Sequence, residues 1–572
     1  MMRKIVNIVV KFRCIVLLLV VSGPLCAQQF NSVPLDNTAY DIIEMGIIRG
    51  MIAPPVSARP WTEAVIKEKL SEMAADPLGK LSSKELDIVA GALSFFDRKT
   101  GIDYSGGRYR TENGGSLAFE TGLGWESVFA VAAPGAPLSS VNMAKVYCAG
   151  DFGSFFSWNI NLRGGFLYID RVELGKYRQP DNVFSPVYEV PSSFFYSFTR
   201  QWDGGVLLPS SPADYHSWPG SFAFGWGAVG EINAAFFDEQ VQLRIGRIRR
   251  DWGTAANGAS LALNAQGRPF TAIEGTAAPF SWLGFSFLAG ALESFDGADQ
   301  WPQAGIFKNG YSLAQIEIKP WNFFYFDAGG AAIWPQSPNL AFFTSLELRL
   351  PGILKIWGSA FVDTIESLAN NFSILDGNAY AYQVGLKSSI SWLSLAAVTM
   401  RYTKVEPYCY TQAGGADNVI SPNGAYTSGG ESLGYYLPPN SDEFLVRLES
   451  LFSPALKAHM QFQMLRHGVD YGYGAVDGSS LRDNIEHGNS TKYFLKDGVY
   501  RWNTVLKIGG TFRLHAGEVP LSIYSEAGMV STRFTINGSA GVGSEADYEG
   551  LNDDVYRAST GFVFSIGFRV YP

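Results

Sequence analysis

The chain contains few charged residues and no long apolar run beyond its first segment. Charged side chains make up 17% of the 572 residues, and the mean hydropathy is +0.03. A helical membrane protein of this length would be far more apolar, because each span needs about 20 consecutive apolar residues. The composition therefore excludes a polytopic helical membrane protein. Glycine (62 residues) and aromatics (14%) are abundant instead, which favours strands, turns and the aromatic girdles of a membrane interface.

Motifs for catalysis and metal binding are absent from the sequence. It has no Gly-x-Ser-x-Gly elbow, no P-loop and no cysteine pair at zinc spacing. None of the histidines has a metal-binding spacing, and His459, which alternates with Gln461 and Gln463, is interpreted as a solvated lining residue. We therefore expect no enzyme, no bound metal and no cofactor. The histidines are His216, His459, His467, His487 and His515.

The first 27 residues are typical of a cleaved signal peptide. A basic start precedes an apolar core at Cys14–Val21, and Leu25-Cys26-Ala27 offers a cleavage site before Gln28. The alternative is a lipoprotein with Cys26 lipidated, although Leu25 is bulky for the position before that cysteine. The basic residues are Arg3, Lys4, Lys11 and Arg13.

Cleavage near Ala27 changes both the charge and the cysteine count. It removes four basic residues, so the net charge falls from −9 to −9 − 4 = −13, and nothing in this balance favours nucleic acid as a partner. Two cysteines remain, Cys148 and Cys409. Export permits a disulfide, but one cysteine falls on a predicted strand and the other in a distant loop. This placement predicts two free thiols.

Residues 35–100 have a helical period and are predicted to form a small domain of their own. Helices are expected from Ala39, from Thr62 and, with Ser82 and Glu85 as a capping box, from about residue 83. Because this segment precedes the first strand, we expect it in the periplasm, where it could contact peptidoglycan or periplasmic proteins.

From about residue 115 onward the period changes to two. Trp158–Arg163, Leu346–Leu350 and Phe562–Tyr571 alternate apolar and polar side chains, which gives each strand one apolar and one polar face. A soluble sheet alternates in the same way, so the connectors decide the fold class. About 18 strand candidates are joined by alternating short and long connectors, as in an even-stranded barrel with short periplasmic turns and long extracellular loops.

The expected fold is thus an all-β transmembrane barrel over residues 115–572, located in the bacterial outer membrane and in contact with its lipid. Short connectors are expected near 151–155, 237–240, 320–321, 351–352, 453–454 and 515–520. Long connectors are expected near 170–220, 251–270, 292–310, 365–378, 403–441, 467–499 and 535–556.

One segment departs from the strict alternation. The strand that begins at Val241 ends in a basic cluster, and a bulge at Gly246 would return Ile248 to the lipid side and turn Arg247 and Arg249 inward.

Guanidinium groups gathered near a barrel mouth can bind carboxylate or phosphate groups of a ligand. The alternative is that these arginines pair with lumen acids such as Glu231 or Glu317. The candidate ligand-binding residues are Arg244, Arg247, Arg249, Arg250, Trp252 and Arg268.

The same segment resembles the Wzi-type capsule assembly family. The resemblance rests on Gly246–Arg249 followed by Trp252-Gly253, a Gly/Ser/Leu-rich loop and Arg268-Pro269-Phe270. The N-terminal segment is similar to that family's through Tyr40–Glu44, Gly46–Gly50 and Arg59–Thr62. This resemblance implies an 18-stranded barrel with a periplasmic helical bundle that holds capsular polysaccharide at the cell surface.

Three functions remain open at this point. The resemblance, together with aromatic loop residues such as Phe194–Tyr196 and Tyr435–Tyr436 that could stack on sugars, favours binding or attachment of surface polysaccharide. The alternative for these aromatic residues is that they pack on one another. The polar inner face permits a porin-like channel for small solutes, since an 18-stranded wall can enclose an aqueous lumen. The alternative is that the long loops plug the lumen. A third hypothesis is a structural or adhesive surface protein whose helical segment docks to peptidoglycan.

Overall fold

The computed structural model describes most of the chain after residue 29. The predicted signal peptide and Phe194–Tyr196 lie outside the described residues. The described ranges are 30–76, 79–97, 117–133, 138–152, 156–170, 204–208, 220–237, 240–253, 259–293, 307–334, 339–363, 379–411, 413–414, 419–420, 425–429, 431–468, 498–516, 519–537 and 559–570.

Three helices precede the barrel: α2 (Ala39–Ile48), α3 (Glu63–Ala75) and α4 (Ser83–Asp97). The predicted capping box is confirmed, because the Ser82 amide donates to Glu85 (2.9 Å) and the Glu85 amide donates back to the Ser82 hydroxyl (3.3 Å). The helices share one apolar core. Its members include Ile42, Ile43, Ile48, Ile66, Leu70, Met73, Ile88 and Val89. In the part of the chain that the structure describes, no helix combines the length and hydropathy needed to cross a bilayer.

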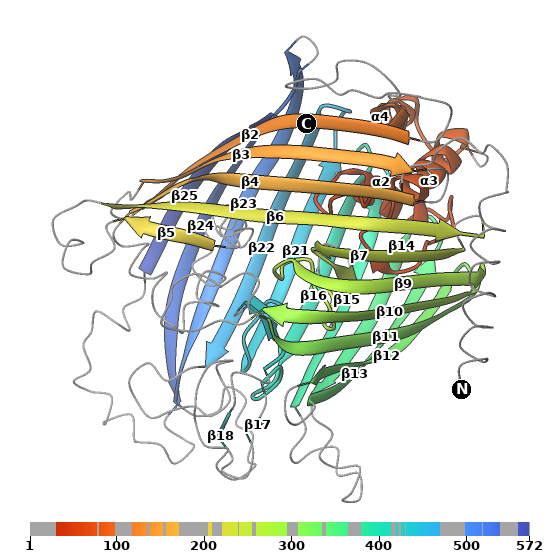
Figure 1. The fold of residues 1–572 in the computed structure, drawn as a ribbon. Helices are drawn as coiled ribbons and strands as arrows, with labels where there is room; N and C mark the ends of the chain where they lie inside the picture. Colours follow the sequence, from red (N-terminus) through yellow and green to blue (C-terminus); the bar gives the residue numbers. More distant parts are fainter. Residues whose placement is uncertain are drawn as a thin grey trace, which may run out of the picture.

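Eighteen antiparallel strands then close into a barrel, as the sequence predicts (Figure 1). They are β2 (Leu117–Ala133), β3 (Leu138–Phe152), β4 (Phe156–Asp170), β6 (Gly220–Phe236), β7 (Val241–Ile248), β9 (Phe270–Phe280), β10 (Leu283–Glu293), β11 (Phe307–Trp321), β12 (Phe324–Trp334), β13 (Asn339–Leu350), β14 (Leu354–Asp363), β15 (Ala379–Ile390), β16 (Ala396–Val405), β21 (Ser441–Leu451), β22 (Leu456–Gly468), β23 (Gly498–Ala516), β24 (Val519–Asn537) and β25 (Ser559–Val570).

Short strands accompany the wall. In the lumen, β1 (Ala58–Arg59) pairs with β8 (Asp251–Trp252), and further two-stranded pieces are β17 (Ala413–Gly414) with β18 (Val419–Ile420) and β19 (Thr427–Ser428) with β20 (Glu431–Ser432). The strand β5 (Gly204–Leu208) pairs with residues 222–226 of β6, whereas β7 pairs with residues 230–236. Because β7 is only 8 residues long, β5 covers part of the β6 edge that β7 does not reach.

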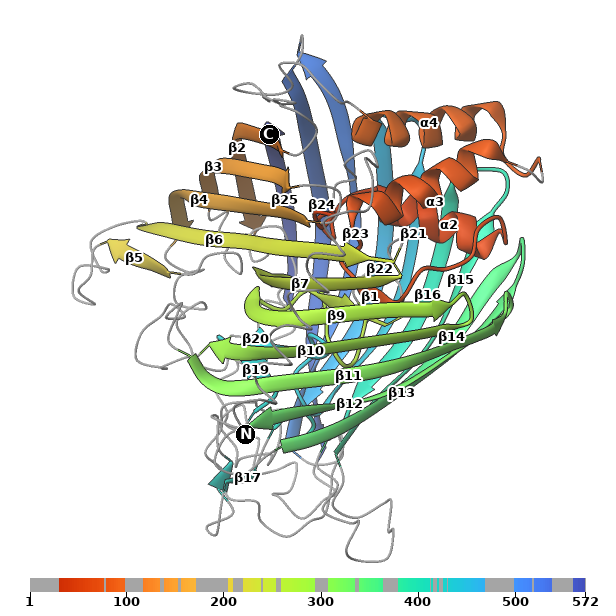
Figure 2. The same ribbon diagram turned by 45° about the vertical axis from the view of Figure 1, so that its right-hand side comes forward.

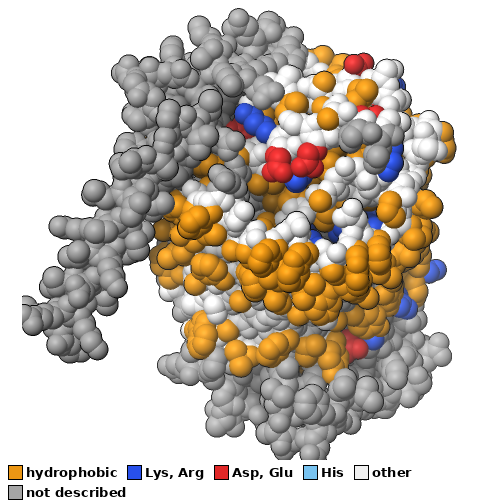
Figure 3. All heavy atoms as spheres, turned by 90° about the vertical axis from the view of Figure 1, so that its right-hand side faces the viewer, with side chains coloured by type: hydrophobic (Ala, Val, Ile, Leu, Met, Phe, Trp, Pro, Cys, Tyr) orange, Lys and Arg blue, Asp and Glu red, His pale blue; other side chains and the backbone are white. Residues whose placement is uncertain are grey.

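The strands sort their side chains between two faces. Along β13, buried and exposed residues alternate without a break, so Leu346 and Leu348 face outward while Ser345 and Glu347 face the lumen. The outward residues form a broad hydrophobic band on the face seen in Figure 3, and charged side chains lie above it. Aromatic side chains mark the rim of the wall: Trp321 and Phe323 are exposed and stack with ring centroids 5.5 Å apart. These features match a lipid-facing surface with an interfacial girdle.

Connector length differs between the two ends of the barrel, as predicted for most connectors; those between β2 and β3 and between β12 and β13, at the end with the long connectors, have four residues each. Connectors at one end have two to five residues, and the three helices lie at this end (Figures 1 and 2). The Gly352 amide in one such turn donates to Ile48 of α2 (2.9 Å), and the Leu395 amide in another donates to Glu85 of α4 (2.9 Å). The helical segment is therefore docked on the short turns.

Two long connectors fold inward. We use "inner loops" for the described parts of residues 249–269 and 406–440. Leu261, Leu263, Tyr410 and Tyr435 of these loops are buried with residues of the inner wall in one apolar cluster. The sequence predicts long extracellular loops here, with a plugged lumen as the alternative. The described parts follow the alternative, because their apolar side chains are buried against the inner wall. Cys148 and Cys409 are both free thiols, as predicted.

Candidate functional site at the end of β7

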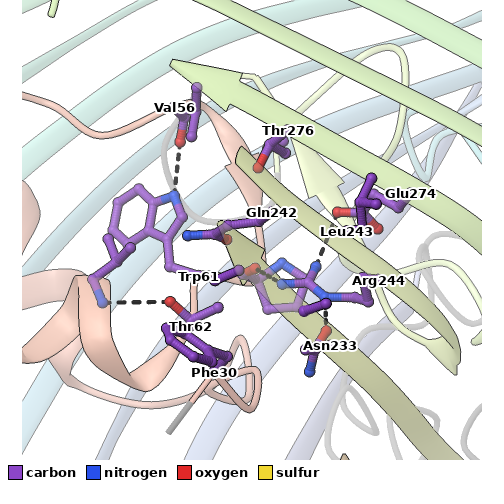
Figure 4. Close-up of a pocket in the computed structure, with 15 residues that line it drawn as sticks. Phe30, Val56, Trp61, Thr62, Asn233, Gln242, Leu243, Arg244, Glu274 and Thr276 are labelled. Carbon is purple, nitrogen blue, oxygen red and sulfur yellow. Dashed lines mark hydrogen bonds and ion pairs between the residues drawn. The ribbon is translucent and has the colours of Figure 1, made fainter. Parts of the chain in front are cut away.

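Arg244 lies at the centre of the basic segment and is surrounded by partners from two neighbouring strands and from the N-terminal segment. Its guanidinium contacts Glu274 of β9 (2.9 Å), Asn233 (3.0 Å) and Glu231 (3.2 Å) of β6, and the backbone oxygen of Pro60 (3.0 Å) (Figure 4). Strand β7 positions it, because Arg244 faces the lumen between Leu243 and Ile245, which face outward. Its charge is therefore matched by two carboxylates of the inner wall.

Arg250 shares Glu274 with Arg244. Its Nε donates to the second oxygen of Glu274 (2.8 Å), while its other nitrogens donate to the backbone oxygens of Ile248 (3.0 Å), Phe270 (2.9 Å) and Gly246 (3.1 Å). The side chain is fully buried. These contacts tie together the two points where the inner loop 249–269 leaves the wall and returns to it.

The other candidate residues lie apart from this pair. Arg247 binds Glu293 of β10 through two nitrogens (3.0 and 3.2 Å), and Arg249 donates to the Ala265 backbone oxygen. Arg268 is buried. Trp252 is buried on β8, and its amide donates to the Leu263 backbone oxygen (2.9 Å). The structure thus brings Arg244 and Arg250 together on one carboxylate and places Arg247 on another.

The predicted bulge at Gly246 is wrong. The pairing of β7 with β6 and with β9 shows no shift of register, and Ile248 is buried instead of lipid-facing. Glycine is required at position 246 for a different reason. A Cβ at Gly246 would lie 2.5 Å from the backbone oxygen of Gly230, so only glycine fits this close approach of β6.

A small cavity lies beside Arg244, between the N-terminal segment and the wall. It holds about 30 Å³ and is lined by Phe30, Trp61, Thr62 and Asn233 among others (Figure 4). That volume has room for about two water molecules. It is too small for a saccharide unit.

No sequence pattern pointed to the residues that dock the N-terminal segment, by which we mean the described residues from 30 to 97. Glu44 of α2 binds Lys355 (2.7 Å) and Lys387 (2.6 Å) of the inner wall. Burial alone would raise the pKa of the Glu44 carboxyl, but the two ammonium groups lower it from its ordinary value of 4.5 to about 2. Deeper in the lumen, Arg59 binds Asp251 (2.7 Å). These pairs join positions hundreds of residues apart in sequence, so no local pattern announces them.

Glu85 makes a further contact at the same end. It binds Arg49 (2.8 Å) and accepts from the Leu395 amide. Burial would raise the pKa of this carboxyl, yet its hydrogen bonds to Arg49, Leu395 and Ser82 lower it to about 2. The capping residue of α4 therefore also holds the helix to a barrel turn.

Tyrosines hold the inner loops. The Tyr410 hydroxyl donates to the Leu261 backbone oxygen (2.8 Å), and the Tyr426 hydroxyl donates to that of Ala262 (2.9 Å). Tyr435 and Tyr436, considered above as sugar-stacking residues, are buried and pack on each other with ring centroids 4.5 Å apart. Their hydroxyls bind Glu443. This pair is part of the lumen filling and does not face outward.

A closed 18-stranded antiparallel barrel with an apolar outer band and short turns at one end is the architecture of bacterial outer-membrane proteins. The fold is similar to that of Wzi, an outer-membrane protein involved in group 1 capsule assembly in Escherichia coli and a carbohydrate-binding β-barrel. The TM-score is 0.53 at 12% identity, over 94% of this chain and 99% of Wzi.

Two other solved structures align with lower scores. OccD3 (OpdP) of Pseudomonas aeruginosa matches with a TM-score of 0.40 at 10% identity, over 83% of this chain and 95% of its own. OccAB2 of Acinetobacter baumannii matches with a TM-score of 0.42 at 8% identity, over 79% of this chain and 97% of its own. No family model and no curated protein matches the sequence. At these identities the likeness concerns the fold.

Proposed function

We propose that this chain is an outer-membrane barrel that binds or attaches surface polysaccharide at its outer face and does not conduct solutes. It would be exported with a signal peptide cleaved near Ala27, with residues 35–100 on the periplasmic side. The observation that carries the proposal is the filled lumen. The N-terminal segment occupies the short-turn end, and the inner loops are packed behind it.

The packing of this filling argues against a diffusion channel. Gln383 of β15 donates to the Ala259 backbone oxygen (3.0 Å), and the Asn264 amide donates to the Leu433 backbone oxygen (2.8 Å), so each inner loop is bonded to the wall or to the other loop. A pore would need these buried contacts to open together. The carbohydrate binding of Wzi, whose fold is similar, favours a glycan as the ligand.

The basic segment has a different role in this proposal. Arg244, Arg247 and Arg250 are each bound to a carboxylate of the wall, and buried paired charges have little capacity left for a ligand. We propose that these arginines, with Arg249, Trp252 and Arg268, hold the inner loop 249–269. The glycan would then contact the long connectors at the outer end.

Two measurements test the proposal. Purified protein refolded in detergent is placed in planar bilayers, with a known porin refolded in parallel; we expect no conductance steps from this chain. Immobilised protein is then titrated with acidic and neutral polysaccharides. Stepwise conductance without glycan binding would establish the channel and overturn the proposal.

The role of the arginines is tested with the double variant R247Q/R249Q. We expect unchanged glycan affinity and faster proteolysis within residues 249–269. If glycan affinity falls tenfold or more while proteolysis is unchanged, the arginines bind the ligand directly, since each lost charge-assisted contact is worth about 1.5–3 kcal/mol. K84Q, on the exposed face of α4, is the matched control for removing a positive charge.

A further inference from the structure

Strands β10 to β13 lie side by side in the wall (Figure 1), and five buried oxygen-bearing side chains lie together on their inner face. Cross-strand pairing places Ser286 opposite Gln315, Glu317 opposite Asp327, and Asp327 opposite Ser345. All five are at most 9% exposed, and Asp327 is 1% exposed. Directly opposed side chains on adjacent strands have Cβ atoms about 5 Å apart. We call this group the β10–β13 cluster.

Few donors serve these oxygens. The Ser57 amide and hydroxyl both donate to Glu317 Oε1 (2.8 Å each), and Gln315 uses its amide nitrogen to donate to the Ser57 hydroxyl (3.0 Å). Tyr325 and Ser345 lie close enough to the Asp327 carboxyl group to interact with it, but neither makes a hydrogen bond of normal geometry with it. Within the described residues, five buried oxygens of the cluster have no hydrogen-bond partner. They are Ser286 Oγ, Gln315 Oε1, Glu317 Oε2, Asp327 Oδ1 and Asp327 Oδ2.

The charge of the cluster is also unbalanced. Glu317 and Asp327 oppose each other directly, and like charges in that position repel. Lys319 lies 3.5 Å from Glu317 Oε2 and also donates to the backbone oxygen of Pro55 (3.1 Å), and within the described residues no cation is paired with Asp327. The next inward acid, Glu347, has its own partner in Arg349. A buried carboxylate left without a counter-charge is costly.

We propose that the β10–β13 cluster binds a hard metal cation, with Ca²⁺ as the ion whose preferences its donors meet. Carboxylate, amide and hydroxyl oxygens are the ligands that Ca²⁺ takes in proteins. A cavity of about 10 Å³, lined by three of the five cluster residues (Gln315, Asp327 and Ser345) and by Trp252 among others, has room for one atom-sized occupant; Glu317 and Ser286 are not among its lining residues. A proton shared between the carboxylates would satisfy at most two of the five oxygens, and a water molecule would leave the charge unbalanced.

A cation bound in the β10–β13 cluster would also affect how the N-terminal segment docks in the lumen. Ser57 belongs to the N-terminal segment, and both of its donors meet Glu317. A cation that neutralises the repulsion between Glu317 and Asp327 would hold the acceptor of Ser57 in place. Binding would therefore stabilise the docking of residues 54–59 in the lumen.

The test uses the full-length protein, purified in detergent free of lipopolysaccharide, which binds Ca²⁺ itself. Thermal unfolding is followed in EDTA, Ca²⁺, Mg²⁺ and Na⁺, and Tb³⁺ luminescence is excited through Trp252, which lines the cavity. We expect Ca²⁺ to raise the Tm by several degrees over EDTA and to displace Tb³⁺. If none of the metal ions changes the Tm and no sensitised Tb³⁺ emission appears, the cluster does not bind a cation and the proposal is wrong.

Three single substitutions test whether the cation binds at the β10–β13 cluster. D327N removes a ligand charge and the repulsion, so we expect it to fold, to be at least as stable as wild type in EDTA, and to bind Ca²⁺ at least tenfold more weakly. S286A removes one oxygen that has no other partner and should weaken binding several-fold with the fold unchanged; it provides the readout if D327N does not fold. D87N, on the exposed face of α4, is the matched control and should respond to Ca²⁺ as wild type does. An unaltered Ca²⁺ response in both D327N and S286A would place the ion elsewhere.

Discussion

The N-terminal segment and the inner loops both fill the lumen, but different interactions hold them to the wall. Ion pairs of Glu44 with Lys355 and Lys387 hold the N-terminal segment to the wall, and Arg59 pairs with Asp251 of the inner loop 249–269. The inner loop 406–440 is held by apolar burial and by neutral hydroxyls, such as those of Tyr410 and Tyr426 on backbone oxygens, whereas the inner loop 249–269 also has the ion pair of Arg250 with Glu274. We call these attachments the N-terminal closure, in which ion pairs have a large part, and the inner closure, which is mainly hydrophobic.

The difference predicts different sensitivities. Ion pairs depend on the protonation of carboxylates, so acid should weaken the N-terminal closure. Burial raises the pKa of Tyr410 and Tyr426 well above its ordinary value, so these hydroxyls stay neutral over the whole acidic and neutral range. The inner loop 406–440 should therefore keep its position when the N-terminal segment is released.

The largest effect is expected where the two closures meet. Arg250 anchors the inner loop and shares Glu274 with Arg244, which in turn holds the Pro60 backbone oxygen. The substitution R250M leaves one Glu274 oxygen and three backbone oxygens without their donor. Breaking a buried ion pair from one side costs about 3–5 kcal/mol. Guanidinium unfolding should show this loss, and limited proteolysis should cut both the inner loop and the N-terminal segment faster. Stability within 1 kcal/mol of wild type would contradict the shared anchor.

Acid should separate the two closures. The Glu44 carboxyl has its pKa lowered from 4.5 to about 2, so its contribution is complete above pH 4.5 and is lost as the pH falls toward 2. The shift corresponds to about 3 kcal/mol. Glu85 acts in the same direction. Pepsin digestion mapped by mass spectrometry should therefore cut residues 39–97 increasingly between pH 4.5 and 2, before it cuts 425–437.

The substitution E44Q is the matched comparison for the acid experiment. It keeps the size of the side chain but removes the charge that Lys355 and Lys387 bind. Its N-terminal segment should already be cut faster at pH 7, and lowering the pH should add less. Equal cleavage of the two closures at every pH would show that they open as one unit.

The wall of the barrel could be predicted because its signals are local. Side chains of a strand alternate between two faces with period two, and connector length is read directly along the chain. The capping box at Ser82 and Glu85 is likewise set within four residues. By contrast, the inward path of the inner loops depends on partners such as the inner-wall residue Gln383, which lies far away in sequence.

The basic segment shows the same limit within one site. The sequence identified the arginines as candidate ligand-binding residues and gave lumen acids such as Glu231 or Glu317 as their alternative partners. Glu231 is a partner of Arg244, at 3.2 Å, but Glu317 instead receives Ser57 of the N-terminal segment. Which acid meets which arginine depends on how strands far apart in sequence are staggered. Residue types alone do not contain that information.

The smallest effect is expected from a single hydroxyl in the inner closure. Tyr410 donates to the Leu261 backbone oxygen and accepts from the Tyr435 amide (3.2 Å), so the substitution Y410F keeps the ring packed but leaves both backbone groups without a partner. A buried unsatisfied group costs about 1–3 kcal/mol. We expect a loss at the lower end, about 1–2 kcal/mol, because the apolar packing of the ring against Phe361 remains. Denaturant midpoints and proteolysis within 259–264 measure it, with Y382F on the outer face as control. The loss should be the same at pH 4 and pH 7, since no charge is involved. A loss that grows with acid would mean that the inner loops depend on the ion pairs of the N-terminal segment after all.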